Sequence, residues 1–223
     1  MVNGLEILKL NKTFIAIIKT KFNNYQSVAN VLKKSKIDYK ITNNKDIISN
    51  SNGIIFPGVG SFDKTVQELK KLNIYDFLKK QIEFKRKPFL GICLGMQLLF
   101  ANSEEGSELE GFNLMKGKIV KLNIKNYPLP NIGWLKIKQI KKSKMLKHID
   151  DNSSFYFNHS YCAEIYDTNC VILKTKYERD FVSMIEKENM IGLQFHPEKS
   201  QKVGEFFFKN FYQEFCLNFN NND

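Results

Sequence analysis

The chain has 223 residues, 43% of them hydrophobic and 26% charged, which is enough for one domain with a sizeable core and short for two. No apolar run reaches the roughly 18 residues needed to cross a bilayer, and the first residues lack the order of a secretory signal peptide. We therefore expect a cytoplasmic protein that does not interact with membranes.

The net charge of +11 would suit an acidic partner, a phosphorylated substrate or nucleic acid. However, the lysines are spread along the chain, outnumber the arginines and accompany many asparagines and isoleucines, which indicates a biased composition. Because no nucleic-acid-binding motif is present, we expect no nucleic-acid partner. The four cysteines form no C-x-x-C pair and do not cluster with histidines, so neither a metal site nor a disulfide is predicted.

Short apolar runs alternate with amphipathic segments in the first half of the chain. The expected buried strands are 14–18, 53–56 and 89–92, and the expected helices are 26–34, 62–72, 74–82 and the run 96–100. This alternation predicts a parallel sheet covered by helices on both faces.

The second half contains mostly strand-like runs, followed by a helix rich in phenylalanine. The runs are 118–122, 135–140, 154–157, 171–175, 181–185 and 191–195, and the helix is 202–215, with Val203, Phe207 and Phe211 on its core-facing side. We expect an α/β fold: a single domain with a central, mostly parallel sheet flanked by helices, plus antiparallel strands. The expected boundaries are an N-terminal extension 1–12, the domain 13–217 and a polar tail 218–223.

The sharpest local pattern is Gly91-Ile92-Cys93-Leu94-Gly95, between a predicted strand and a helical run. It fits a nucleophile elbow, in which a sharp turn needs small residues on both sides of the nucleophile. The helix N-terminus then favours the thiolate of Cys93, and the backbone N–H of Leu94 can stabilise an oxyanion. The same pattern is compatible with a buried structural cysteine in a turn.

A thiolate nucleophile needs a base and a group that orients it. Of the three histidines, His148 lies in a lysine-rich stretch and is predicted on the surface, whereas His196 ends an apolar run. Glu198 follows two residues later, and residues two apart on an extended segment share a face, so it is predicted to orient His196. The order nucleophile, histidine, acid differs from that of α/β-hydrolases, where the acid precedes the histidine.

A third segment, Pro57-Gly58-Val59-Gly60-Ser61-Phe62, lies between a predicted strand and a predicted helix. Such a loop can direct backbone N–H groups into a site at the carboxyl edge of a parallel sheet, and by itself it is also an ordinary turn.

Taken together, four stretches resemble the class I glutamine amidotransferases, and within them the glutaminase subunits of imidazole glycerol phosphate synthases. They are PGVGSFDKTVQEL from Pro57, GICLGMQLLFANSEEG from Gly91, FNHSYCAEI from Phe157 and GLQFHPEKSQKVGEFFFKNF from Gly192. They cover most of the chain in the family's order, so that 13–217 is expected to be the amidotransferase domain.

The resemblance implies hydrolysis of glutamine to glutamate and ammonia, with Cys93 as nucleophile, His196 as proton donor and Glu198 orienting it. Gly58, Val59 and Leu94 would shape the oxyanion hole. Positions that hold glutamine in the family are matched by Gln97, Glu105, Ser160 and Tyr161, while His159 belongs to the binding segment.

In the family the ammonia passes to a (β/α)₈-barrel partner in a heterodimer. That partner makes imidazole glycerol phosphate and an aminoimidazole carboxamide ribonucleotide in histidine biosynthesis. The resemblance implies no metal and no organic cofactor.

Two segments depart from the family's pattern. The D-Y-G-x-G-N run is replaced by residues 19–24, where only Asn24 fits, and P-H-x-G-W-N is replaced by residues 130–135, which lack the histidine and the final asparagine. Both lie near the partner interface in the family. An alternative is therefore a paralogous glutaminase that supplies ammonia to another amidotransferase, such as one that modifies a surface sugar. A non-catalytic regulatory subunit is a further alternative, although all three triad positions are filled.

Overall fold

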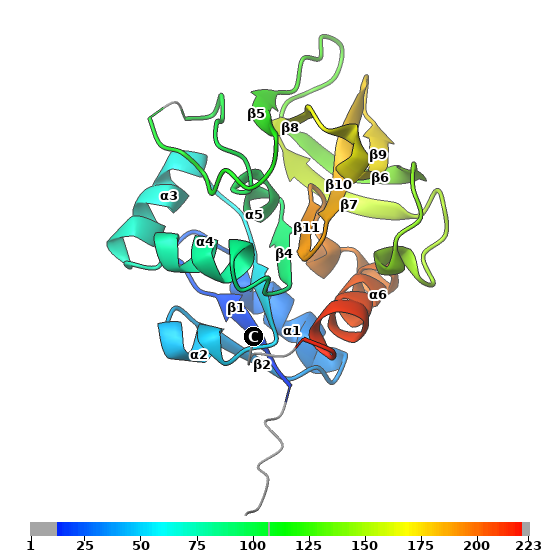
Figure 1. Ribbon diagram of the computed structural model, residues 1–223. Helices are drawn as coiled ribbons and strands as arrows, with labels where there is room; N and C mark the ends of the chain where they lie inside the picture. Colours follow the sequence, from blue (N-terminus) through cyan, green and yellow to red (C-terminus); the bar gives the residue numbers. More distant parts are fainter. Residues whose placement is uncertain (1–12, 107, 220–223) are drawn as a thin grey trace, which may run out of the picture.

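A mixed nine-stranded sheet forms the centre of the computed structural model, which describes residues 13–106 and 108–219 (Figure 1). The strand order is β2-β1-β3-β4-β11-β10-β9-β6-β7. The parallel part comprises β1 (Ile15–Ile18), β2 (Tyr39–Thr42), β3 (Gly53–Phe56), β4 (Phe89–Ile92) and β11 (Met190–Leu193). The antiparallel part comprises β6 (Asn131–Gln139), β7 (Ser154–His159), β9 (Val171–Lys176) and β10 (Asp180–Lys187). The predicted α/β class with added antiparallel strands is confirmed.

Helices cover both faces of the parallel part because its strands are apolar on both sides. On one face lie α1 (Tyr25–Lys34) and α6 (Gln201–Phe211), and on the other α2 (Lys45–Ser49), α3 (Phe62–Lys71) and α4 (Tyr75–Glu83). Along β1, Ile15 and Ile17 pack towards the first face, whereas Ala16 and Ile18 pack towards the second. The predicted docking of the last helix is confirmed, since Phe207 and Phe211 are fully buried.

Smaller elements complete the described fold. A separate two-stranded sheet pairs β5 (Gly117–Lys121) with β8 (Tyr161–Ile165). The short helical turns are η1 (Lys144–Leu146), η2 (Thr168–Cys170), η3 (Pro197–Lys199) and the π-turn η4 (Tyr212–Cys216) that continues α6. No helix in the described part of the chain is both long and apolar enough to span a membrane.

Four elements differ from the sequence-based expectation. Strands β2 and β8 and helix α2 were not predicted, and β2 is an edge strand whose alternate residues are only partly buried. The helix expected at 96–100 is instead the single turn α5 (Leu94–Gln97). It ends there because the carbonyls of Leu98 and Leu99 accept hydrogen bonds from the backbone of Phe112 and Leu114.

The expected extension 1–12 lies outside the described residues. At the other end, Phe219 packs on the domain: its carbonyl accepts from the Asn52 side chain at 3.2 Å, and its ring lies 4.8 Å from the Lys87 ammonium. The described start of the predicted polar tail therefore contacts the core.

Candidate active site

Three neighbouring parallel strands deliver the three predicted site segments to one edge of the sheet. The strand β4 is flanked by β3 and β11, and the chain leaves β3 at Pro57, β4 at Cys93 and β11 at Gln194. The register pairs Leu193 with Ile92, so the segments that follow these residues emerge side by side. This shared edge is where open α/β sheets place their sites.

Cys93 occupies a strained turn between β4 and α5. Its φ of 52° and ψ of −104° are unusual for a residue with a side chain, and its N–H donates to the Leu193 carbonyl at 2.6 Å. A Cβ on Gly95 would lie 2.2 Å from the Phe56 carbonyl oxygen, and one on Gly91 would lie 2.4 Å from the Gly95 carbonyl oxygen. The two glycines are therefore needed for the turn, as the predicted nucleophile elbow requires.

The helix that follows the elbow contributes less than expected to thiolate stabilisation. Because α5 has only four residues, few peptide dipoles add at Cys93. Leu94 is at the first helical position, where an N–H has no intrahelical acceptor, and so remains available for an oxyanion.

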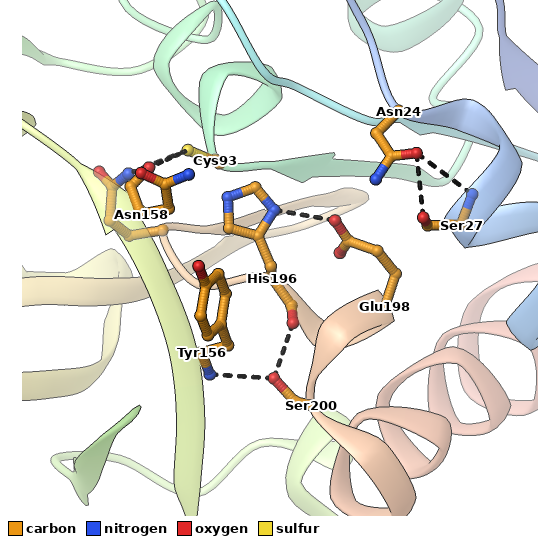
Figure 2. A network of polar contacts seen from close by, with 9 residues as sticks. Asn24, Ser27, Cys93, Tyr156, Asn158, His196, Glu198 and Ser200 are labelled. Carbon is orange, nitrogen blue, oxygen red and sulfur yellow. Dashed lines mark hydrogen bonds and ion pairs between the residues drawn. The ribbon is translucent and has the colours of Figure 1, made fainter. Parts of the chain in front are cut away.

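His196 lies between Cys93 and Glu198 (Figure 2). Its Nδ1 is 2.8 Å from Glu198 Oε1, and the two side chains are 1% and 2% exposed. The predicted contact is confirmed, but its backbone is different: Glu198 lies in the 3₁₀ turn η3 rather than on an extended segment. Burial alone would lower the pKa of His196, but the nearby Cys93 sulfur, together with the hydrogen bond and charge of Glu198, raises it to about 10. This environment stabilises a charged imidazolium at His196.

Ser200 fixes the backbone of His196. Its Oγ donates to the His196 carbonyl at 2.7 Å and accepts from the Tyr156 N–H at 3.1 Å, while the His196 N–H donates to the Tyr156 carbonyl at 2.8 Å (Figure 2). These bonds join β7 to the start of α6, so the histidine is held by two elements.

A cavity of about 160 Å³ opens beside Cys93. It is lined by Val59, Gly60, Cys93, Leu94, Gln97, Glu105, Asn158, His159, Ser160 and Tyr161. Gln97 donates to the Tyr161 carbonyl at 3.2 Å, which joins α5 to the start of β8. Glu105 accepts the N–H of Phe62 at 2.9 Å; burial raises the pKa of its carboxyl, the Phe62 bond opposes this, and Asp63 adds to it. The cavity thus brings together the predicted glutamine-binding positions and the nucleophile.

Gly58 is placed differently from the other predicted site residues. It does not line the cavity but packs behind the elbow, where an added Cβ would lie 2.4 Å from the Gly95 nitrogen. It therefore lets the loop after β3 approach Cys93, and Val59 is the residue of this pair that faces the cavity.

Two residues near the cavity carry contacts that the sequence patterns did not reveal. Asn158 reaches the wall next to Cys93, whose sulfur lies 3.9 Å from its carbonyl oxygen. Asn131, one of the departures from the family pattern, is fully buried and its Nδ2 lies 3.1 Å from His159 Nε2. Only the pairing of β6 with β7, which puts these two residues opposite one another, indicates this contact.

The surface position predicted for His148 agrees with the structure. His148 is exposed, and the four cysteines are free and buried. Among the described residues, no group of three or more histidine, cysteine, aspartate or glutamate side chains is arranged to hold a metal ion.

Comparisons with family models and with curated proteins agree on one family. The model of the family "Glutamine amidotransferase class-I" matches residues 14–215. Imidazole glycerol phosphate synthase subunit HisH 2 of Methanococcus maripaludis is 41% identical over 201 residues, covering 90% of this chain and 99% of that protein. Subunit HisH 1 of Campylobacter jejuni (strain RM1221) is 38% identical and covers 88% of this chain and 98% of that protein.

Solved structures share the fold at low identity. The structure of PurLQS from Thermotoga maritima has a TM-score of 0.71 at 15% identity, covering 91% of this chain and 99% of that one. A crystal structure of a glutamine amidotransferase has a TM-score of 0.68 at 13% identity, with 88% and 96% covered. By its matched family model and its relatives, the chain belongs to the class I glutamine amidotransferases, and within them to the HisH family.

Proposed function

We propose that this chain is the glutaminase subunit of an imidazole glycerol phosphate synthase, and that it releases ammonia from glutamine for use in histidine biosynthesis. The observation that carries the proposal is the alignment of Cys93, His196 and Glu198 beside a cavity of glutamine-binding type.

Each side chain has a role in this reaction. The Cys93 thiolate attacks the side-chain carbonyl carbon of glutamine, and the N–H groups of Val59 and Leu94 stabilise the oxyanion that forms. His196, held by Glu198, transfers a proton to the departing ammonia and leaves a γ-glutamyl thioester on Cys93. His196 then takes a proton from water, and the hydroxide adds to the thioester carbonyl, which releases glutamate and restores the Cys93 thiolate and the His196 imidazolium.

Substrate specificity follows from the polar groups around the cavity. A carboxylate at Glu105 suits the α-ammonium group of glutamine, and Gln97, Ser160 and Tyr161 offer further polar contacts. A free ammonium ion offers no such set of contacts, so the site favours the amino acid as the ammonia donor.

The acceptor chemistry belongs to a partner. We infer that a (β/α)₈-barrel synthase receives the ammonia in a heterodimer and makes imidazole glycerol phosphate and an aminoimidazole carboxamide ribonucleotide. The named relatives, which are subunits of that synthase, support this assignment.

A second candidate function rests on the departures at 19–24 and 130–135. On β6, Ile132 and Trp134 are 58% and 46% exposed, so this segment presents large apolar side chains on the surface, beside the changed positions Asn131, which is buried, and Leu135, which is half-buried. Changed residues in segments that lie near the partner in the family, together with an intact triad, favour a paralogue that supplies ammonia to another amidotransferase, such as one acting on a surface sugar.

Release of glutamate from glutamine tests the first proposal. The purified chain is measured alone and with each barrel synthase of its source organism, with and without the acceptor, and with Cys93→Ala as control. We expect turnover that rises with partner and acceptor and vanishes in the variant. Absence of turnover in every pairing, together with no labelling of Cys93 by a glutamine-analogue electrophile, would favour a non-catalytic subunit.

Complementation separates the two pathways. A histidine auxotroph lacking its own glutaminase subunit should grow when this chain is expressed with its barrel partner. Failure to grow despite good expression of both proteins, with glutaminase activity intact, would favour the paralogous role.

A further inference from the structure

Gln194 contacts the nucleophile. Its Nε2 lies 3.6 Å from Cys93 Sγ, within hydrogen-bonding distance for sulfur, and the side chain is fully buried. Gln194 itself does not line the glutamine cavity.

The backbone holds Gln194 in a defined position. It follows β11, and its N–H donates to the Ser183 carbonyl at 2.9 Å. Because His196 is two residues further on, one short segment presents both an imidazole and an amide to the same sulfur.

Burying this amide is costly for the fold. Gln194 Oε1 is buried and has no hydrogen-bond partner among the described residues. An amide oxygen without a partner destabilises a protein, and an apolar side chain of similar size would avoid the cost. An apolar residue at position 194 would lose the contact between the amide N–H and the Cys93 sulfur. This contact is therefore what the buried amide provides.

An N–H donor favours the thiolate over the thiol, because hydrogen bonds to a charged acceptor are the stronger ones. Titratable groups around Cys93 are His196 with Glu198 behind it, and Glu105, His159 and Tyr161 at the cavity wall. Since α5 is a single turn, a donor on the sulfur supplies stabilisation that a longer helix would otherwise provide.

We propose that Gln194 is a further residue of the glutaminase site: its side-chain N–H stabilises the Cys93 thiolate and holds the sulfur in place for attack. The proposal rests on the glutaminase function proposed above. An amide turned the other way would present Oε1 to the sulfur and favour the neutral thiol, so the sign of the effect is diagnostic.

The test measures the rate at which iodoacetamide alkylates Cys93 as a function of pH, followed by mass spectrometry of the peptide that contains it. Gln194→Met keeps the length and burial of the side chain but removes the donor. We expect the apparent pKa for alkylation to rise by about one unit, so that alkylation slows about tenfold at pH values below the apparent pKa of the wild type. Glutamate release with the barrel partner should fall by a similar factor through kcat.

A second variant and a control make the result decisive. Gln194→Glu places a carboxylate beside the sulfur and should shift the apparent pKa further in the same direction. Gln81→Leu, which replaces another buried glutamine on the distant helix α4, should leave the alkylation profile unchanged. Thermal unfolding of each variant establishes that it is folded.

An unchanged or lowered apparent pKa in either folded Gln194 variant would overturn the proposal. Alkylation does not require turnover, so the outcome is independent of the proposed function. If the pKa shifts but no pairing releases glutamate, the thiolate contact stands and the glutaminase assignment fails.

Discussion

The two buried histidines of this molecule both lie near the nucleophile and differ in almost every other respect. His159 ends β7 and is 6% exposed, while His196 follows β11 and is 1% exposed. Burial lowers the pKa of His159 to about 4, with His196 adding to the effect and the Tyr161 carbonyl opposing it. The pKa of His196 is raised to about 10.

The difference comes from the partners of each ring. His159 packs against Phe157 and Phe181 at centroid distances of 5.8 and 5.0 Å, and its nitrogens meet the Tyr161 carbonyl at 2.9 Å and Asn131 Nδ2 at 3.1 Å. Those partners are neutral, and they suit a neutral ring protonated at Nδ1. His196 has a carboxylate on one side and a thiol on the other, so a charge on this ring is stabilised. Proximity to the nucleophile alone does not make a general base; a charged partner does.

Exchange of each histidine for glutamine gives the largest expected contrast. His196→Gln removes the proton carrier and should lower kcat for glutamate release about 10³-fold. His159→Gln keeps a polar group in the cavity wall and should change kcat less than about tenfold, with its effect mainly on KM. Steady-state kinetics with the barrel partner measure both. A loss at His159 as large as that at His196 would break the comparison.

The acid stability of the protein should report His159. Its folded pKa of about 4 is below the ordinary value of 6.5, so the unfolded chain binds a proton that the folded chain does not. The stability is therefore complete above pH 6.5 and is lost as the pH falls towards 4, by about 3 kcal/mol in all.

Urea unfolding at pH 7 and pH 5 should show this loss in the wild type and a smaller one in His159→Gln. Equal losses in the two proteins would contradict the assignment. His196 has the opposite sign: its raised pKa gives stability that is complete below pH 6.5 and is lost as the pH rises towards 10.

Removing the charge of Glu198 should make His196 more like His159. Glu198→Gln keeps the shape but takes away one of the causes of the raised pKa, so the alkaline limb of the pH–rate profile should move to lower pH. We expect kcat/KM at neutral pH to fall about 100-fold, less than for loss of the imidazole. An alkaline limb that stays in place would mean that Cys93 alone sets the pKa of His196.

The sequence patterns predicted the elements and contacts that depend on residues close together in the chain. They missed the end of a helix and a side-chain contact that depend on residues far apart in the chain. Strands 53–56 and 89–92 were placed correctly because each is a short apolar run with turn residues nearby. The contact of Glu198 with His196 was also predicted, although a 3₁₀ turn supplies it. The end of α5 is fixed by hydrogen bonds from the segment 111–115, and the contact of Asn131 with His159 depends on strand register. No local pattern contains this information.

The smallest expected effects come from the groups that hold each histidine. Ser200→Ala leaves the Tyr156 N–H without its partner and frees the His196 carbonyl, which should cost about 1.5 kcal/mol of stability. Asn131→Leu removes the donor to His159 Nε2 and should cost a similar amount of stability.

The two variants should differ in activity. Ser200→Ala loosens the His196 ring that transfers the proton and should lower kcat several-fold, whereas Asn131→Leu should leave kcat nearly unchanged. Urea unfolding and steady-state kinetics on both proteins measure this, and equal losses of kcat would show that the two histidines are coupled through β7, on which both Tyr156 and His159 lie.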